Sequence, residues 1–80
     1  MIQHTSISQK EFVTLHVGDI IYYLLSLADK PTNPEREWKG RITLIRQADE
    51  YTCVSLLDEG YEGYSDEVYR PQIVRYERAL

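Results

Sequence analysis

The sequence predicts an all-β domain built from five short strands. Residues 38–58 contain two runs in which apolar and polar residues alternate, separated by a polar break at residues 47–50. Alternation at period two around a polar break is typical of an antiparallel hairpin, and an isolated hairpin needs further strands to be stable in water. Shorter runs rich in β-branched and aromatic residues lie on both sides of it, and no stretch keeps the period of an amphipathic helix.

The size and charge of the chain limit what it can do. Its 80 residues suit one domain, which buries about 60% of the surface exposed by the unfolded chain. It carries 9 basic and 13 acidic residues, a net charge of −4. This balance argues against a dedicated nucleic-acid or membrane-surface binder, since affinity for phosphate comes from clustered Lys and Arg.

The cysteine count and the absence of a targeting pattern predict a cytoplasmic protein. Cys53 is the single cysteine, so no internal disulfide and no Cys-rich zinc site can form. The first twelve residues lack the basic start and apolar run of a signal peptide. The longest apolar run, residues 20–27, is too short to span a membrane, so we expect no membrane partner.

The N-terminal segment is expected to be a flexible arm over residues 1–11, followed by the domain at 12–78. Ser8 and Glu11 have the spacing of a capping box, so the alternatives are one helical turn or a frayed tail. The tail is favoured because chain ends stay mobile unless they are docked. Residues 12–17 alternate weakly, with Val13, Leu15 and Val17 apolar, and predict an extended lead-in.

The first strand is expected at Ile20–Leu27, directly after the turn signal Gly18-Asp19. Both of its faces are apolar: Ile21, Tyr23 and Leu25 on one, Ile20, Tyr22 and Leu24 on the other. A strand of this kind is buried on both sides or carries a partner surface. The outer face therefore predicts a cover, supplied by the N-terminal arm or by a second copy of the chain.

The connection at residues 28–37 contains two prolines and several turn-forming side chains. It is long for a hairpin loop, so it is a candidate functional loop or a rigid spacer between strands. The hairpin follows it. Trp38, Gly40, Ile42 and Leu44 share one face of its first strand, and Thr52, Val54 and Leu56 share one face of its second. The indole and the Ile42 side chain are expected to point into the core together.

The last third of the chain predicts two short strands and two tight turns. In residues 59–65, Gly60 and Gly63 allow positive φ, so Tyr61 and Tyr64 are expected to project from a tight turn. Residues 67–69 form a short fourth strand. Pro71 opens one tight helical turn. Residues 73–76 then form a final strand that pairs with the first.

This order of parts resembles an SH3-like barrel of the Tudor and KOW type. The matching features, spread over residues 17–77, are Gly18-Asp19, the proline-containing loop, Trp38-x-Gly40-x-Ile42, the glycine-bearing turn and the turn at Pro71. The resemblance implies a small five-stranded SH3-like barrel with a short N-terminal extension. The same barrel serves unrelated functions, so it carries less weight for function than for fold.

Tudor-like domains hold methylated Lys or Arg in an aromatic cage, and the resemblance places Trp38, Tyr61 and Tyr64 near the cage position, with Tyr22 close enough to join them. Aromatic faces attract cations, and Glu59 and Glu62 would add to that attraction. The alternative is that Trp38 belongs to the core and the tyrosines cover turns. The favoured function is a non-catalytic protein- or peptide-binding module using these four residues, with homodimer formation as a further possibility.

Integrase C-terminal barrels and KOW domains suggest nucleic-acid binding as the alternative function. Its candidate residues are Lys39, Arg41, Arg46 and Arg75, which would form one basic face if their strands meet. Residues 48–67 speak against it, because they contain seven acidic residues and no Lys or Arg.

No pattern predicts an enzyme, a metal site or a cofactor. His4 and His16 lie twelve residues apart, and no spacing joins them to carboxylates as metal ligands. Cys53 lies mid-strand with no histidine nearby in sequence, so it is expected to be structural. The carboxylates Asp58, Glu59 and Glu62 lack the ligand pattern of a calcium loop, and no glycine-rich phosphate loop is present.

Overall fold

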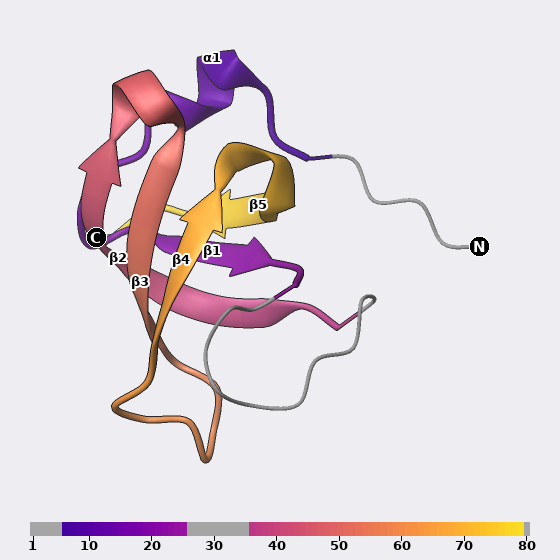
Figure 1. The fold of residues 1–80 in the computed structure, drawn as a ribbon, viewed down its shortest axis with the longest axis vertical. Helices are drawn as coiled ribbons and strands as arrows, with labels where there is room; N and C mark the ends of the chain where they lie inside the picture. The colour runs from indigo at the N-terminus through magenta and orange to yellow at the C-terminus, as the bar shows by residue number, and fades with distance from the viewer. Residues whose placement is uncertain (1–5, 26–35, 80) are drawn as a thin grey trace.

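The computed structural model describes residues 6–25 and 36–79. Five antiparallel strands form one sheet in the order β4-β3-β2-β1-β5, and the sheet curls around the core (Figure 1). The strands are β1 (Ile20–Tyr23), β2 (Trp38–Arg46), β3 (Tyr51–Leu56), β4 (Ser65–Tyr69) and β5 (Ile73–Glu77). Short helices flank them: α1 (Gln9–Phe12), η1 (Gln47–Asp49) and η2 (Arg70–Gln72). The predicted all-β class with five strands is confirmed.

Period-two alternation places the predicted side chains in the core. Trp38 and Ile42 of β2 are both buried, as expected. Thr52, Val54 and Leu56 of β3 face them across the paired strands. The final strand, β5, pairs with β1 as predicted. Most of the loop expected at residues 28–37 lies outside the described residues.

The prediction for Leu44 was wrong, because β2 is bulged. The β2–β3 register shifts between Ile42 and Leu44, so Leu44 is 38% exposed and Ile45 packs against the core in its place. A bulge adds one residue to one strand and moves every later side chain to the opposite face. Alternation alone does not reveal where the extra residue falls.

The first strand is shorter than expected. β1 ends at Tyr23, and Leu25 adopts a left-handed conformation with φ 59° and is exposed, instead of continuing the inner face. The Gln72 side chain donates hydrogen bonds of 3.0 Å to the carbonyl oxygens of Leu24 and Leu25. The Leu24 N–H also donates to the Gln72 carbonyl at 3.0 Å, so both the backbone and the side chain of Gln72 bind the chain where β1 ends.

The segment before β1 is folded against the sheet. The capping box is present: Ser8 and Glu11 bond reciprocally at the start of α1. Ile7, Phe12 and Leu15 are buried in the core. The extended lead-in predicted for residues 12–17 was wrong, because Phe12 ends α1, Val13 has helical backbone angles, and turns follow at residues 13–14 and 17–18. The Ile7 N–H also donates to the carbonyl of Ile73 at 2.9 Å. Residues 7–11 of the expected arm are thus docked, whereas residues 1–5 lie outside the described chain.

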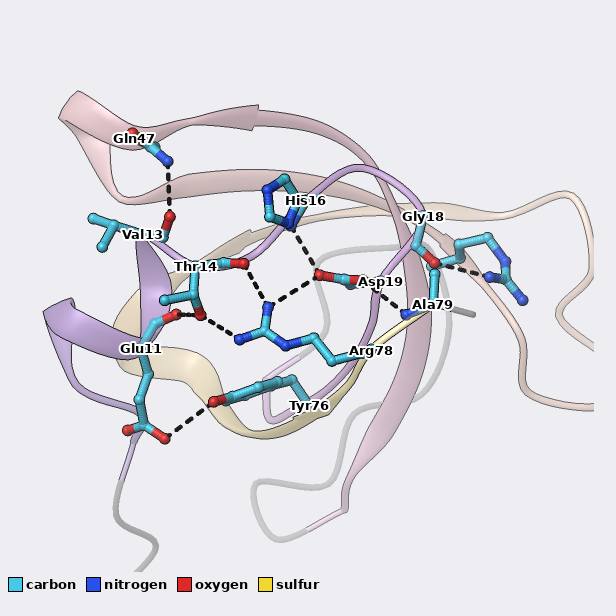
Figure 2. A network of polar contacts seen from close by, with 11 residues as sticks. Glu11, Val13, Thr14, His16, Gly18, Asp19, Gln47, Tyr76, Arg78 and Ala79 are labelled. Carbon is cyan, nitrogen blue, oxygen red and sulfur yellow. Dashed lines mark hydrogen bonds and ion pairs between the residues drawn. The ribbon is translucent and has the colours of Figure 1, made fainter.

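A buried carboxylate joins the segment just before β1 to the C-terminal residues (Figure 2). Asp19 accepts hydrogen bonds from the backbone N–H of His16 at 2.9 Å and of Ala79 at 2.8 Å. Arg78 lies between Asp19, at 3.5 Å, and the carbonyl and hydroxyl oxygens of Thr14 (Figure 2). The Gly18-Asp19 turn therefore holds the C-terminal residues as well as starting β1.

The two predicted turns near the C-terminal end are confirmed. Gly60 and Gly63 have φ values of 89° and 91°, which L side chains rarely adopt. Pro71 lies in the 3₁₀ turn η2, which separates β4 from β5. The β3–β4 loop that contains the two glycines lies at the opposite end of the molecule from α1 (Figure 1).

Candidate partner-binding site

Three of the four predicted aromatic residues meet at the β3–β4 loop. Tyr61 contacts the Trp38 indole edge-on, with ring centroids 5.1 Å apart at 85°. Tyr64 contacts Tyr61 in the same manner at 5.6 Å and 81°. Edge-to-face pairs of this kind are favourable beyond the area that they bury. The series runs from Trp38, which is fully buried, to Tyr64, which is 42% exposed.

A cation of the chain itself lies on the indole. The guanidinium carbon of Arg36 is 3.4 Å from the Trp38 ring centroid and 5.7 Å from that of Tyr61. Its Nη2 lies 3.4 Å from Oδ1 of Asp58, and the other oxygen of that carboxylate accepts from the Lys39 backbone N–H at 2.9 Å. We call this group the Trp38 site; it consists of Arg36, Trp38, Asp58, Tyr61 and Tyr64.

A buried hydrogen bond lies next to the site. Tyr23, directly opposite Trp38 in the β1–β2 ladder, donates its hydroxyl to Oδ2 of Asp66 at 2.6 Å. Burial, and then the hydrogen bond to Asp66, raise the pKa of Tyr23 far above its usual range. The phenol therefore stays protonated and acts as a fixed donor inside the core.

Tyr22, the fourth predicted residue, lies away from this group. It precedes Tyr23 in β1, and successive side chains of a strand point to opposite faces, so Tyr22 is on the outer face while Trp38 is inside. The Arg75 guanidinium lies 3.9 Å from its ring centroid, and Lys39 Nζ lies 5.8 Å away. Long cationic side chains thus supply part of the cover expected from an arm or a second copy. Self-association stays a prediction.

The candidate nucleic-acid residues are brought together in part. Lys39 and Arg75 flank Tyr22 in the outer face, and Arg41 is opposite Ile20 in the next row. Arg46 is at the far end of β2, beyond the bulge, where it lies over Tyr51 at 5.5 Å. Arg75 is paired with Glu37 at 3.0 Å, which offsets part of the positive charge.

Sequence reasoning did not assign Arg36 and Asp58 to the aromatic group. A signal for Arg36 was present: residues two apart in an extended chain share a face, and Arg36 precedes Trp38 by two. Asp58 carried no such signal, because it is twenty residues from Trp38 and joins it only through the pairing of β2 with β3.

Features that would indicate other chemistry are few in the part of the chain that the structure describes. One hollow of about 310 Å³ lies between α1 and η1, and another of about 340 Å³ is lined by Cys53 and residues 65–67. Among residues 6–25 and 36–79, no three His, Cys, Asp or Glu side chains are grouped to hold a metal ion. No helix in those ranges has the length and apolar character to cross a membrane.

The fold makes this chain a small all-β protein with a five-stranded antiparallel sheet. Searches for similar proteins add no family to that description: neither a family model, nor a curated protein, nor a solved structure matches the chain.

Proposed function

We propose that the protein is a non-catalytic binding module, an SH3-like barrel that holds a segment of a partner protein at the Trp38 site. The observation that supports this most is the edge-to-face series Trp38–Tyr61–Tyr64, which runs from the core to the surface. Tyr64 is 42% exposed, and its backbone is bonded on both sides: its N–H donates to the Tyr61 carbonyl at 3.1 Å and its carbonyl accepts from the Leu56 N–H at 3.1 Å.

The residue types suit a partner surface. Tyr and Trp supply large contact area with few rotatable bonds, and they dominate the binding energy of protein interfaces. Asp58, Glu59 and Glu62 belong to the same β3–β4 loop as the two tyrosines and make it acidic. A segment carrying positive charge is the electrostatic complement of this loop.

Peptide titration of isotope-labelled protein tests the proposal. Four short peptides, one each basic, acidic, proline-rich and aromatic, would be titrated while backbone amide shifts are recorded. We expect the basic peptide to shift amides of residues 58–65. The Tyr64→Ala variant should weaken that binding by about 1–2 kcal/mol, a five- to thirtyfold change in Kd.

Tyr69→Ala is the matched control. Tyr69 is 45% exposed and contacts Tyr51 edge-on at 5.2 Å, so it reproduces the exposure and pairing of Tyr64 elsewhere on the surface. We expect its Kd to equal that of the wild type. If no peptide shifts residues 58–65, or if both variants lose affinity equally, the proposal is wrong.

The outer face supports nucleic-acid binding as a second candidate function, because Lys39, Arg41 and Arg75 share it around Tyr22. Retention on a heparin or DNA column at low salt, with elution that depends steeply on salt, would favour this function. A protein that passes through such a column at low salt does not have it.

A further inference from the structure

We propose that the Trp38 site recognises an arginine side chain of the partner, and that Arg36 is an internal occupant which this arginine displaces. The inference rests on the proposed function and specifies it. The chain shows through its own residue which chemical group the site accepts, because the Arg36 guanidinium lies 3.4 Å from the indole centroid.

Three contacts define the chemistry of that position. The Trp38 ring offers a flat face, Tyr61 stands nearly perpendicular to it with its centroid 5.7 Å from the guanidinium, and Asp58 offers a carboxylate oxygen. A guanidinium is planar, so it stacks on an aromatic face while its edge donates to a carboxylate. A lysine ammonium is a compact, strongly hydrated charge and cannot make both contacts with one planar group.

The Trp38 ring and the Asp58 carboxylate, which together bind the guanidinium, are held in place by contacts that do not involve Arg36. Asp58 is held by the backbone N–H of Lys39 through Oδ2, the oxygen that Arg36 does not use. Trp38 is fixed in β2 between β1 and β3. An incoming guanidinium therefore meets an oriented carboxylate and an oriented ring, which lowers the ordering cost of binding.

The polar contacts of Arg36 are weak enough for an arginine of the partner, which would make the same stacking contact, to compete with it. Its side chain is 38% exposed, and its ion pair with Asp58 spans 3.4 Å. Ion pairs of this exposure contribute little to stability. Arg70 shows the contrast: its side chain is 20% exposed and is held both by Glu50 and by the carbonyl of Ile7.

The Arg36→Gln variant tests the inference through the fluorescence of Trp38, the only tryptophan in the chain. The probes are acetyl-Gly-Gly-Arg-Gly-Gly amide and the same peptide with Lys. If Arg36 fills the position about 90% of the time, its removal should tighten the binding of the Arg peptide about tenfold. The Lys peptide should bind more weakly than the Arg peptide in the variant.

The matched control is Arg46→Gln, because Arg46 also lies over an aromatic ring but 5.5 Å from Tyr51 and outside the Trp38 site. It should bind the Arg peptide as the wild type does. A second measurement uses the wild type alone: the Nε–Hε resonance of Arg36 should shift as the Arg peptide binds. This measurement decides the matter if Arg36→Gln does not fold.

The outcomes separate the two proposals. If the peptides shift residues 58–65 but Arg36→Gln leaves the Kd unchanged, or the Lys peptide binds as tightly as the Arg peptide, the inference is wrong and the binding site stands. An unmoved Arg36 resonance in the wild type has the same meaning. If no peptide shifts residues 58–65, the proposed function itself is wrong.

Discussion

Gly40 shows how one residue sets the spacing of two strands. It lies in β2 opposite Leu56, and its backbone needs no positive φ. A Cβ atom at this position would lie 2.7 Å from Cγ2 and 2.8 Å from Cβ of Val54, and 3.3 Å from the Ser55 carbonyl oxygen. Val54 is buried and β-branched, so it cannot turn away. Only glycine fits at position 40, because the Val54 side chain occupies the space that a Cβ atom of residue 40 would need.

Gly40→Ala is therefore expected to destabilise the fold, although alanine is otherwise the better residue in a strand. Overpacking of this kind costs about 1–3 kcal/mol. The thermal midpoint should fall by roughly 4–8 °C for each kcal/mol. Thermal unfolding followed by circular dichroism measures this, and an unchanged or higher midpoint would refute the packing argument.

At the scale of an element, the segment before β1 completes the core. α1 has only four residues, too few to be stable alone, so its capping box and its buried side chains must act together. Phe12 is 1% exposed while Val13, the next residue, is 53% exposed. The helical turn therefore separates a core residue from a surface residue where the sequence pattern suggested an extended chain.

Phe12→Ala should destabilise the protein by about 3–5 kcal/mol, because it removes a buried aromatic ring and leaves a cavity. Val13→Ala, its neighbour, should change the free energy of unfolding by about 0.5 kcal/mol or less. Urea unfolding at equilibrium measures both. Equal effects of the two substitutions would mean that this segment is not part of the cooperative core.

At the scale of the whole molecule, Asp19 joins segments that are sixty residues apart, since it bonds to Ala79 as well as to His16. Burial raises the pKa of its carboxyl, but the N–H groups of Ala79 and His16 and the charge of Arg78 together hold the pKa below the ordinary value of 3.8. A carboxyl whose folded pKa is depressed stabilises the fold above its unfolded pKa. This contribution is lost as the pH falls below about 4, through the folded pKa.

Asp19→Asn should lower the free energy of unfolding at pH 7 by about 1.5–3 kcal/mol. The N–H groups of His16 and Ala79 bond to different oxygens of the carboxylate, and an Asn amide has one acceptor oxygen, so one N–H loses its acceptor and the other bonds to a neutral group. The variant should also lose less stability than the wild type between pH 4 and pH 2. Urea unfolding at several pH values measures both effects. Asp49→Asn, an exposed change in η1, is the control and should follow the wild type. Parallel pH profiles for Asp19→Asn and the wild type would contradict the assignment.

The sequence by itself determined what depends on near neighbours. Alternation predicted that Trp38 and Ile42 face inward and that Val54 shares a face with Thr52 and Leu56, since successive side chains of a strand take opposite faces whatever lies around them. Glycine spacing predicted the turn that carries Tyr61 and Tyr64, since positive φ is a local property.

Only the tertiary structure decided what depends on strand pairing and register. The bulge that exposes Leu44 is defined by the pairing of β2 with β3. The hydrogen bond between Asp19 and Ala79 forms only because the C-terminal residues return beside β1. Tyr22 was grouped with Trp38 from the sequence, yet the two point to opposite sides of the sheet because Tyr23, and not Tyr22, is opposite Trp38. Which side chains meet is set by pairings between distant segments, and a one-residue change in register alters the answer.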